Sequence, residues 1–328
     1  MEPGAPIPLV RRFPALEQIS RARIGRFPTP VTKMTALAPG LWFKREDLSA
    51  EPLGGNKTRA LEFLLGDVRA GERVVTVGAA GSTHALATAV YARQLGAHPI
   101  IYRWPQEMTD TAAAVSDRLV RDFDQPGVRR GLVGAYARAL LARLRGARWI
   151  PAGGSTPVGI LGQVNAALEL NEQVEGGVIP RLDRVVVPLG TGGTLAGLAL
   201  GFSIADLETE VVGVRVVPRV VGNLARVRRL VSRTARLIER RTGERIPRPR
   251  PNAIHVIHDF YGGAYGRATS AGTEVAARCL ALTGVEIDPT YGAKALAAAL
   301  ALHEREGGIT LFWLSFDARW LRGVVALD

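Results

Sequence analysis

Apolar residues occur along the chain in short runs, separated by longer stretches of helical character. Five runs rich in valine, isoleucine and leucine predict buried β-strands, at residues 73–77, 99–102, 184–189, 210–216 and 309–314. Alanine-rich stretches such as 85–95 and 293–303 predict helices with small faces that pack closely. Strands that alternate with helices indicate parallel βαβ units, and the pattern therefore predicts an α/β fold.

Length and composition agree with this fold class. The chain has 328 residues, 47% of them apolar, which is enough for one large α/β unit or two modest domains. No apolar run approaches the length of a membrane span. A single cysteine, Cys279, excludes an internal disulfide and is typical of a reducing compartment. We therefore expect a cytoplasmic protein without a membrane segment.

The net charge of +12 is concentrated in one segment. Residues 219–250 contain eleven arginines and no lysine, against two acids, Glu239 and Glu244. A helix is predicted at about residues 221–241, with an apolar stripe that is buried and arginines that face water. Such a face can attract nucleic acid, but the segment has no interleaved aromatic residues and no known nucleic-acid-binding motif. We expect a solvated basic face rather than a nucleic-acid partner.

Lysine is rare in this chain, which has four lysines and 38 arginines. One of them, Lys57, ends the motif Gly54-Gly55-Asn56-Lys57 at the start of a helix predicted at residues 58–65. A guanidinium cannot form a Schiff base, whereas an amine can once burial lowers its pKa. Glycines before the lysine let the backbone approach a ligand closely. The motif fits a catalytic lysine, and it fits an ordinary lysine at a helix start equally well.

A second glycine-rich motif, Gly190-Thr191-Gly192-Gly193-Thr194, follows the strand predicted at residues 184–189 and precedes a helix of small residues. Loop N–H groups, the helix dipole and threonine hydroxyls together favour an anion. Leu195 occupies the last position of the dinucleotide fingerprint and so excludes it, and no Gly-Lys-Ser/Thr of a P-loop follows. We predict a site for one phosphate, with a strand-to-helix turn that binds nothing as the alternative. A lysine and a phosphate site together suggest pyridoxal phosphate.

Taken in order, the motifs of this chain resemble those of the D-cysteine desulfhydrase and 1-aminocyclopropane-1-carboxylate deaminase family, which has the tryptophan-synthase-β-like fold. The resemblance extends over nearly the whole chain and is carried by residues 44–48 (KREDL), 54–57, 61–65, 78–84, 151–162 (PAGGSTPVGILG), 190–201, 261–266 and 288–294 (DPTYGAK). It implies a two-domain, fold-type-II pyridoxal phosphate enzyme of mostly parallel sheets. The smaller domain would cover residues 48–150 and the larger one 1–47 plus 151–328, with the cofactor between them. The family also implies a homodimer.

The resemblance also implies a role for individual residues. Lys57 would carry the Schiff base and move protons, and it would form the catalytic set with Ser82, Tyr265 and Tyr291. The other cofactor contacts would come from Asn56, Thr83, Gly190, Thr191, Gly192, Gly193, Thr194 and Ser315. Substrate would be bound by Ser82, Thr83 and His84, and no metal is expected. A plain helix-capping role for Ser82 or Thr83 is the alternative for those two residues.

Two stretches depart from the family pattern. The family usually has Gln-Ser-Asn-His at residues 81–84, so Thr83 replaces an asparagine that donates to the phenolic oxygen of the cofactor. Near the C-terminus, Ser315 takes the place of the threonine that contacts the pyridine nitrogen, and Phe316 and Asp317 replace two glycines. A neutral hydroxyl at that nitrogen suits elimination better than transamination. If the Asp317 carboxylate reached the nitrogen instead, the pyridine would be more protonated, and elimination would no longer be favoured over transamination.

The resemblance therefore predicts elimination or deamination of a small amino acid to a keto acid and ammonia. His84 matches the histidine of desulfhydrase-like members rather than the glutamine typical of the cyclopropane deaminases, which favours β-elimination from D-cysteine. A racemase or a β-replacement synthase is an alternative within the same fold. A degenerate paralogue that binds an amino acid or a protein partner without turnover is an alternative of a different class.

Overall fold

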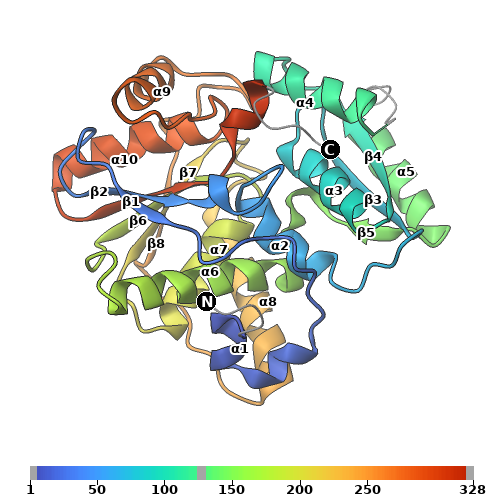
Figure 1. Ribbon diagram of the computed structural model, residues 1–328, viewed down its shortest axis with the longest axis horizontal. Helices are drawn as coiled ribbons and strands as arrows, with labels where there is room; N and C mark the ends of the chain where they lie inside the picture. Colours follow the sequence, from blue (N-terminus) through green and yellow to red (C-terminus); the bar gives the residue numbers. More distant parts are fainter. Residues whose placement is uncertain (1–5, 124–130, 323–328) are drawn as a thin grey trace.

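The computed structural model describes residues 6–123 and 131–322 and contains two sheets flanked by helices (Figure 1). A six-stranded sheet has the order β1-β2-β9-β6-β7-β8, and a three-stranded sheet has the order β4-β3-β5. Neighbouring described strands are parallel, except that β1 is antiparallel to β2. The strands are β1 Val31–Lys33, β2 Leu41–Arg45, β3 Arg73–Ala79, β4 His98–Trp104, β5 Arg148–Ile150, β6 Arg184–Leu189, β7 Glu210–Arg215, β8 Ile254–Ile257 and β9 Thr310–Leu314.

Helices cover both faces of the larger sheet (Figure 1). Helix α10, with α9 packed on it, lies over one face, and α6, α7 and α8 lie on the other side. None of the described helices combines the length and the apolar content needed to cross a membrane. The α-helices are α1 Pro8–Arg12, α2 Asn56–Leu64, α3 Thr83–Gln94, α4 Asp110–Arg121, α5 Leu132–Leu144, α6 Pro157–Glu175, α7 Gly193–Ile204, α8 Leu224–Thr242, α9 Ser270–Thr283 and α10 Gly292–Glu306; the short 3₁₀ helices are η1 Pro14–Gln18, η2 Glu46–Leu48, η3 Ala152–Gly154 and η4 Ala318–Arg322.

Strand β6 shows why a continuous apolar run forms a central parallel strand. Its side chains alternate between the two faces of the sheet, and both faces are covered by helices. Val185 and Val187 belong to the core formed with α6 and α7, whereas Val186 packs in the core formed with α10. The five predicted strand runs are confirmed as β3, β4, β6, β7 and β9, with bounds that differ by at most two residues.

The three-stranded sheet is covered in the same way. On β3, Val74 packs in the core that contains α3, while Val75 and Val77 face the opposite core, which contains Ala139 of α5. The predicted division of the chain into domains at residues 48 and 150 stays a prediction.

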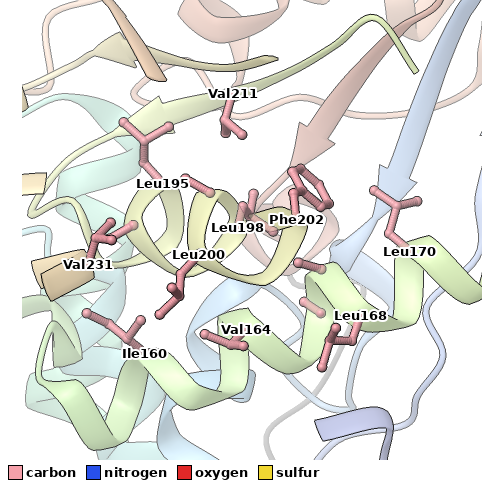
Figure 2. Close-up of a cluster of buried hydrophobic side chains, with 14 of the residues drawn as sticks. Ile160, Val164, Leu168, Leu170, Leu195, Leu198, Leu200, Phe202, Val211 and Val231 are labelled. Atoms are coloured by element: carbon pink, nitrogen blue, oxygen red, sulfur yellow. The ribbon is translucent and has the colours of Figure 1, made fainter. Parts of the chain in front are cut away.

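Helix α7 packs against α6 (Figure 2), and two glycines of α7 allow their close contact. A Cβ at Gly197 would lie 2.3 Å from the Cβ of Gln163, and a Cβ at Gly201 would lie 2.4 Å from the Cβ of Ala167. Any larger residue would push the helices apart, because protein interiors are close-packed. The start of α7, which carries the second glycine-rich motif, is therefore fixed relative to α6.

Helix α8 carries the basic segment and confirms the helix predicted there. Its buried residues, Val227, Leu230 and Val231 among them, lie in the main core, and the arginines at 228, 229, 233, 236, 240 and 241 are exposed. An Asn223 cap begins the helix, and Gly243 ends it in the left-handed conformation, with φ 74°. The apolar stripe explains the helix without a ligand for its basic face.

Neutralising this face is expected to change little. We expect Arg228→Gln, Arg229→Gln and Arg236→Gln together to leave turnover within about twofold of the unchanged protein, because exposed, unpaired charges contribute little to a folded structure. Steady-state assays of the triple variant check this. Tight, salt-sensitive binding of DNA or RNA that disappears in the triple variant would contradict the view of a merely solvated surface.

Candidate active site

One cavity, here called the Lys57 cavity, is lined by residues from distant parts of the sequence. The described residues that line it are Asn56, Lys57, Thr83, Pro188, Gly190, Thr191, Gly192, Gly193, Thr194, Leu195, Tyr291, Ser315 and Phe316. They include every residue for which the family resemblance implies a cofactor contact. Several of them directly follow the carboxyl ends of β6 and β9, where ligands of open α/β sheets commonly bind.

The start of α2 places Lys57 in this cavity. Gly55 has φ 135°, and a Cβ there would lie 2.8 Å from the carbonyl oxygen of Ser315, so glycine is required. The next N–H group, of Asn56, donates to that same oxygen at 2.9 Å. Burial lowers the pKa of Lys57 to about 8, and its amine has no hydrogen bond or ion pair with any described residue. A substantial fraction of the amine is therefore neutral, and thus nucleophilic, near pH 8.

The other lysines are placed differently. The Lys44 amine donates to the Glu169 carboxylate at 2.6 Å, and Lys33 is exposed. Lys294 is fully buried, and its amine donates to the carbonyl oxygen of Tyr261 at 2.7 Å. Burial lowers the pKa of Lys294 to about 8 as well, but this residue is not among those described as lining the Lys57 cavity.

The loop Gly190–Thr194 is held in place by side chains from three other segments. The Thr191 and Ser155 hydroxyl oxygens are 2.6 Å apart, and the Asn56 amide donates to the Thr194 hydroxyl at 2.8 Å. The guanidinium of Arg226, on α8, donates to the Thr191 carbonyl oxygen at 3.0 Å. These contacts leave the N-terminus of α7 at the cavity wall, where its N–H groups and dipole favour an anion.

Ser82 and His84 flank Thr83, but neither is among the described residues that line the cavity. Ser82 caps α3, and its hydroxyl accepts from the N–H of Ala85 at 3.2 Å. The His84 ring is buried, with Nε2 3.3 Å from the Thr76 hydroxyl. Burial, together with the charge of Lys57, lowers the pKa of His84 to about 3, so that the ring is neutral near pH 7. Their substrate-binding roles stay predictions, and the capping alternative describes the contact that Ser82 makes.

The two predicted tyrosines are paired. The Tyr265 and Tyr291 hydroxyls are hydrogen-bonded to each other, and Tyr291 lines the cavity. The Asp288 carboxylate accepts from the N–H of Tyr291 at 2.7 Å and thereby fixes the turn before α10. Burial raises the pKa of Tyr291 well above its usual value, and the neighbouring Tyr265 adds to this effect. Both phenols are therefore protonated near neutral pH, so that they can donate hydrogen bonds or protons.

Residues 315–317, where the chain departs from the family pattern, have distinct environments. Ser315 and Phe316 line the cavity. The Asp317 carboxylate is instead bound by the Arg319 guanidinium, through Nε and Nη2, at 2.8 Å each. Asp317 is not among the described residues of the cavity wall. Of residues 315–317, which follow β9, Ser315 is therefore the one that presents a polar side chain to the cavity.

Sequence reasoning missed three residues that support the cavity. Gln163 donates to the Asn56 carbonyl oxygen at 2.7 Å, and Ser155 and Arg226 hold the phosphate-site loop. Ser155 lies within the motif at residues 151–162 and Gln163 directly follows it, so the motif was the available signal. Arg226 could not be distinguished among the many arginines of its segment.

A lysine with a lowered pKa beside a helix terminus that favours an anion fits pyridoxal phosphate, and comparison with known proteins defines the class. Residues 23–315 match the model of the family described as pyridoxal-phosphate dependent enzyme. The chain is 32% identical over 312 residues to the D-cysteine desulfhydrase of Salmonella paratyphi A, with 90% of each chain covered.

Solved structures of pyridoxal-phosphate dependent enzymes have the same fold as this chain. A crystal structure of an ACC (1-aminocyclopropane-1-carboxylate) deaminase homologue superposes with a TM-score of 0.79 and 26% identity, covering 97% of this chain and 99% of the other. Threonine deaminase isoform 2 from Solanum lycopersicum, at 16% identity and a TM-score of 0.64 over 96% of this chain and 88% of its own, shares the fold. The chain belongs to the ACC deaminase and D-cysteine desulfhydrase family of pyridoxal-phosphate dependent enzymes, with the fold-type-II architecture.

Proposed function

We propose that this protein catalyses β-elimination from a small amino acid with a leaving group on Cβ, D-cysteine first among the candidates. The observation that carries the proposal is the Lys57 amine, half-buried and with a lowered pKa, in the same cavity as the Gly190–Thr194 loop. The reaction would convert D-cysteine and water to pyruvate, hydrogen sulfide and ammonia.

Residues of the cavity would contact both ends of the cofactor. Hydroxyls of Thr191 and Thr194, with the N–H groups at the start of α7, would hold the phosphate. A Cβ at Gly190 would meet no atom within 4 Å, so the absence of a side chain leaves room beside the loop. Ser315 would face the ring nitrogen. When bound, pyridoxal phosphate supplies an aldehyde that condenses with amines and a ring that draws electrons from Cα.

Proton transfer would be the task of Lys57 and the tyrosine pair. An amine with a pKa of about 8 can accept the Cα proton and return a proton near neutral pH. Tyr291, which lines the cavity and is hydrogen-bonded to Tyr265, would donate to the substrate or the leaving group. The neutral Ser315 hydroxyl would leave the ring a mild electron sink, which would suffice when a thiol leaves with the electrons.

The proposal is tested with cofactor-loaded protein and a panel of amino acids. We expect pyruvate and sulfide from D-cysteine, pyruvate and chloride from β-chloro-D-alanine, and slower or no turnover of the L-isomers. Pyruvate is measured with a coupled dehydrogenase and sulfide colorimetrically. 1-Aminocyclopropane-1-carboxylate belongs in the panel, with 2-oxobutyrate as its expected product if the protein is a deaminase of that substrate.

Two outcomes would contradict the proposal. Release of 2-oxobutyrate from the cyclopropane amino acid without release of pyruvate from D-cysteine would make the protein a cyclopropane deaminase. A change in the visible spectrum on adding amino acids, with no keto acid from any of them, would indicate a protein that binds amino acids without turnover.

A further inference from the structure

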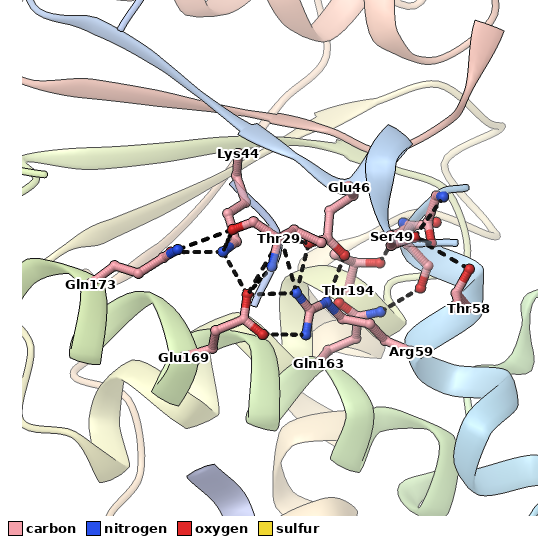
Figure 3. A network of polar contacts seen from close by, with 12 residues as sticks. Thr29, Lys44, Glu46, Ser49, Thr58, Arg59, Gln163, Glu169, Gln173 and Thr194 are labelled. Atoms are coloured by element: carbon pink, nitrogen blue, oxygen red, sulfur yellow. Dashed lines mark hydrogen bonds and ion pairs between the residues drawn. The ribbon is translucent and has the colours of Figure 1, made fainter. Parts of the chain in front are cut away.

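Two residues beyond Lys57 on α2, the Arg59 guanidinium lies in a buried cluster of charges (Figure 3). Arg59 is 1% exposed, Glu46 and Lys44 are 0% exposed, and Glu169 is 2% exposed. These four residues, here called the charge quartet, come from α2, η2, β2 and α6. Two cations and two carboxylates make the quartet neutral overall.

The geometry of the quartet depends on the planar fork of the arginine. Its Nε and Nη2 atoms donate to Glu46 at 2.6 and 2.8 Å, and its Nη1 and Nη2 atoms donate to Glu169 at 3.0 and 2.9 Å. Two bidentate pairs thus hold one guanidinium from two directions, an arrangement that a lysine amine cannot reproduce. Phe27 stacks on the guanidinium, with its ring centroid 4.1 Å away.

The remaining donors and acceptors are also satisfied. The Lys44 amine donates to Glu169 at 2.6 Å, to Gln173 at 2.7 Å and to the Thr29 carbonyl oxygen at 2.8 Å. Burial alone would raise the pKa of Glu169, but Arg59 and Lys44 outweigh that effect and lower it to about 2. The Glu169 carboxylate therefore stays ionised near neutral pH, whereas burial lowers the pKa of Lys44 against the opposing effect of Glu169.

A buried ion cluster is poor evidence for stability, because desolvation of the ions offsets their attraction. It does restrict geometry, since each ion accepts only a few arrangements of its partners. Here the restricted element is α2, whose first turn carries Lys57. Gly162 of α6 also packs directly on α2, because a Cβ there would lie 2.0 Å from the Arg59 carbonyl oxygen. Rotation or sliding of α2 would break both bidentate pairs together.

We propose that Arg59, held between Glu46 and Glu169, is the positioning residue for Lys57, fixing the rotation of α2 so that the amine lies in the Lys57 cavity. This inference rests on the proposed role of Lys57 and deepens it. With two cations and two carboxylates, the quartet carries no net charge that would shift the pKa of Lys57. This agrees with burial as the cause of the lowered pKa of that amine. The titratable groups that face Lys57 from other elements, His84 and Tyr291, are neutral near pH 8.

The test is the rate at which added pyridoxal phosphate attaches to Lys57 in the full-length, cofactor-stripped protein. Attachment is trapped with borohydride and quantified by peptide mass, at pH values from 6 to 10. In the unchanged protein the rate should rise with pH and level off above about pH 8, because the neutral amine reacts. Arg59→Lys keeps the charge but loses the fork, and we expect attachment at least about tenfold slower. Its pH profile should move upward, toward the usual lysine range, because a displaced amine is less buried.

Matched variants separate positioning from general damage. Glu172→Gln, on the same helix as Glu169 but in an exposed pair with Arg11, should behave like the unchanged protein. Glu169→Gln should slow attachment, and Lys44→Met combined with Glu169→Gln should stay slow, because Arg59 still lacks its second carboxylate partner. The double variant leaves no lysine amine buried without its carboxylate, so a restored rate would trace the defect to Lys44 and contradict the inference. Circular dichroism and thermal melting show which variants are folded.

If Arg59→Lys lowers the melting temperature while the attachment rate and its pH profile stay unchanged, the quartet is purely structural and the inference is wrong. Equal behaviour of Glu169→Gln and Glu172→Gln would also overturn it. Attachment does not require turnover, so the two proposals fail separately. Arg59-dependent attachment without any keto acid product would contradict the proposed reaction and leave this inference standing.

Discussion

Replacing Lys57 by arginine is expected to abolish both covalent attachment of pyridoxal phosphate and turnover. Arginine keeps a positive charge and a similar length, but a guanidinium neither forms a Schiff base nor accepts a proton near neutral pH. We expect kcat/KM to fall by at least about 10³-fold, within the range seen when a proton-transfer group is removed. In the unchanged protein, borohydride reduction followed by peptide mapping should place the cofactor on Lys57.

The chain offers a matched control and a strong competitor. Lys33→Arg changes an exposed lysine and should leave attachment and turnover as they are. Lys294 is the competitor, since burial also lowers its pKa to about 8. Label found on the Lys294 peptide, or attachment that persists in Lys57→Arg, would show that the cofactor binds elsewhere.

Replacing Gly190 by valine is expected to weaken cofactor binding about 100-fold or more. A Cβ at this position would meet no protein atom within 4 Å, so the side chain would enter open space at the cavity wall without disturbing the core. There it would displace a phosphate that relies on several charge-assisted hydrogen bonds, each worth about 1.5–3 kcal/mol. Equilibrium titration of stripped protein with pyridoxal phosphate measures the effect.

Substitutions at two other glycines serve as controls for this experiment. Gly131→Val, on the surface where a Cβ would also meet nothing within 4 Å, should not change affinity. Gly192→Ala should reduce stability as well as affinity, because Gly192 has φ 91° and its Cβ would press on Val227 of α8 at 3.2 Å. An unchanged affinity in folded Gly190→Val would mean that the phosphate is not bound by this loop.

Local sequence was sufficient to predict β6, the loop after it and the start of α2. A buried parallel strand, a glycine-rich turn and a helix terminus each depend on residues that are neighbours in the sequence. Their patterns can therefore be recognised from the sequence alone. The capping contact of Ser82 is also local, and it competes with the substrate role that the resemblance implied.

The supporting contacts could not be predicted in this way. Arg59 and Glu169 are 110 positions apart in the sequence, and nothing near either residue specifies the other. Arg226 donates to a loop 35 positions away from within a segment full of arginines. Asp317 could be assigned to Arg319 rather than to the cavity only once the turn after β9 was seen. Tertiary packing decides which of many similar charges meet.

Helix α6 packs on the two helices whose first turns carry Lys57 and the phosphate-site loop. It contacts the Lys57 helix through Gln163, Glu169 and Gly162, and the same helix receives the glycine face of α7, at whose start the phosphate would bind. The distance between the Lys57 amine and the phosphate-site loop therefore depends on how α2 and α7 pack on α6. Changes of substrate preference, whether by evolution or by engineering, should therefore fall on lining residues outside α2, α6 and α7 that hold no proposed catalytic role, such as Phe316, where a side chain can vary without altering that distance.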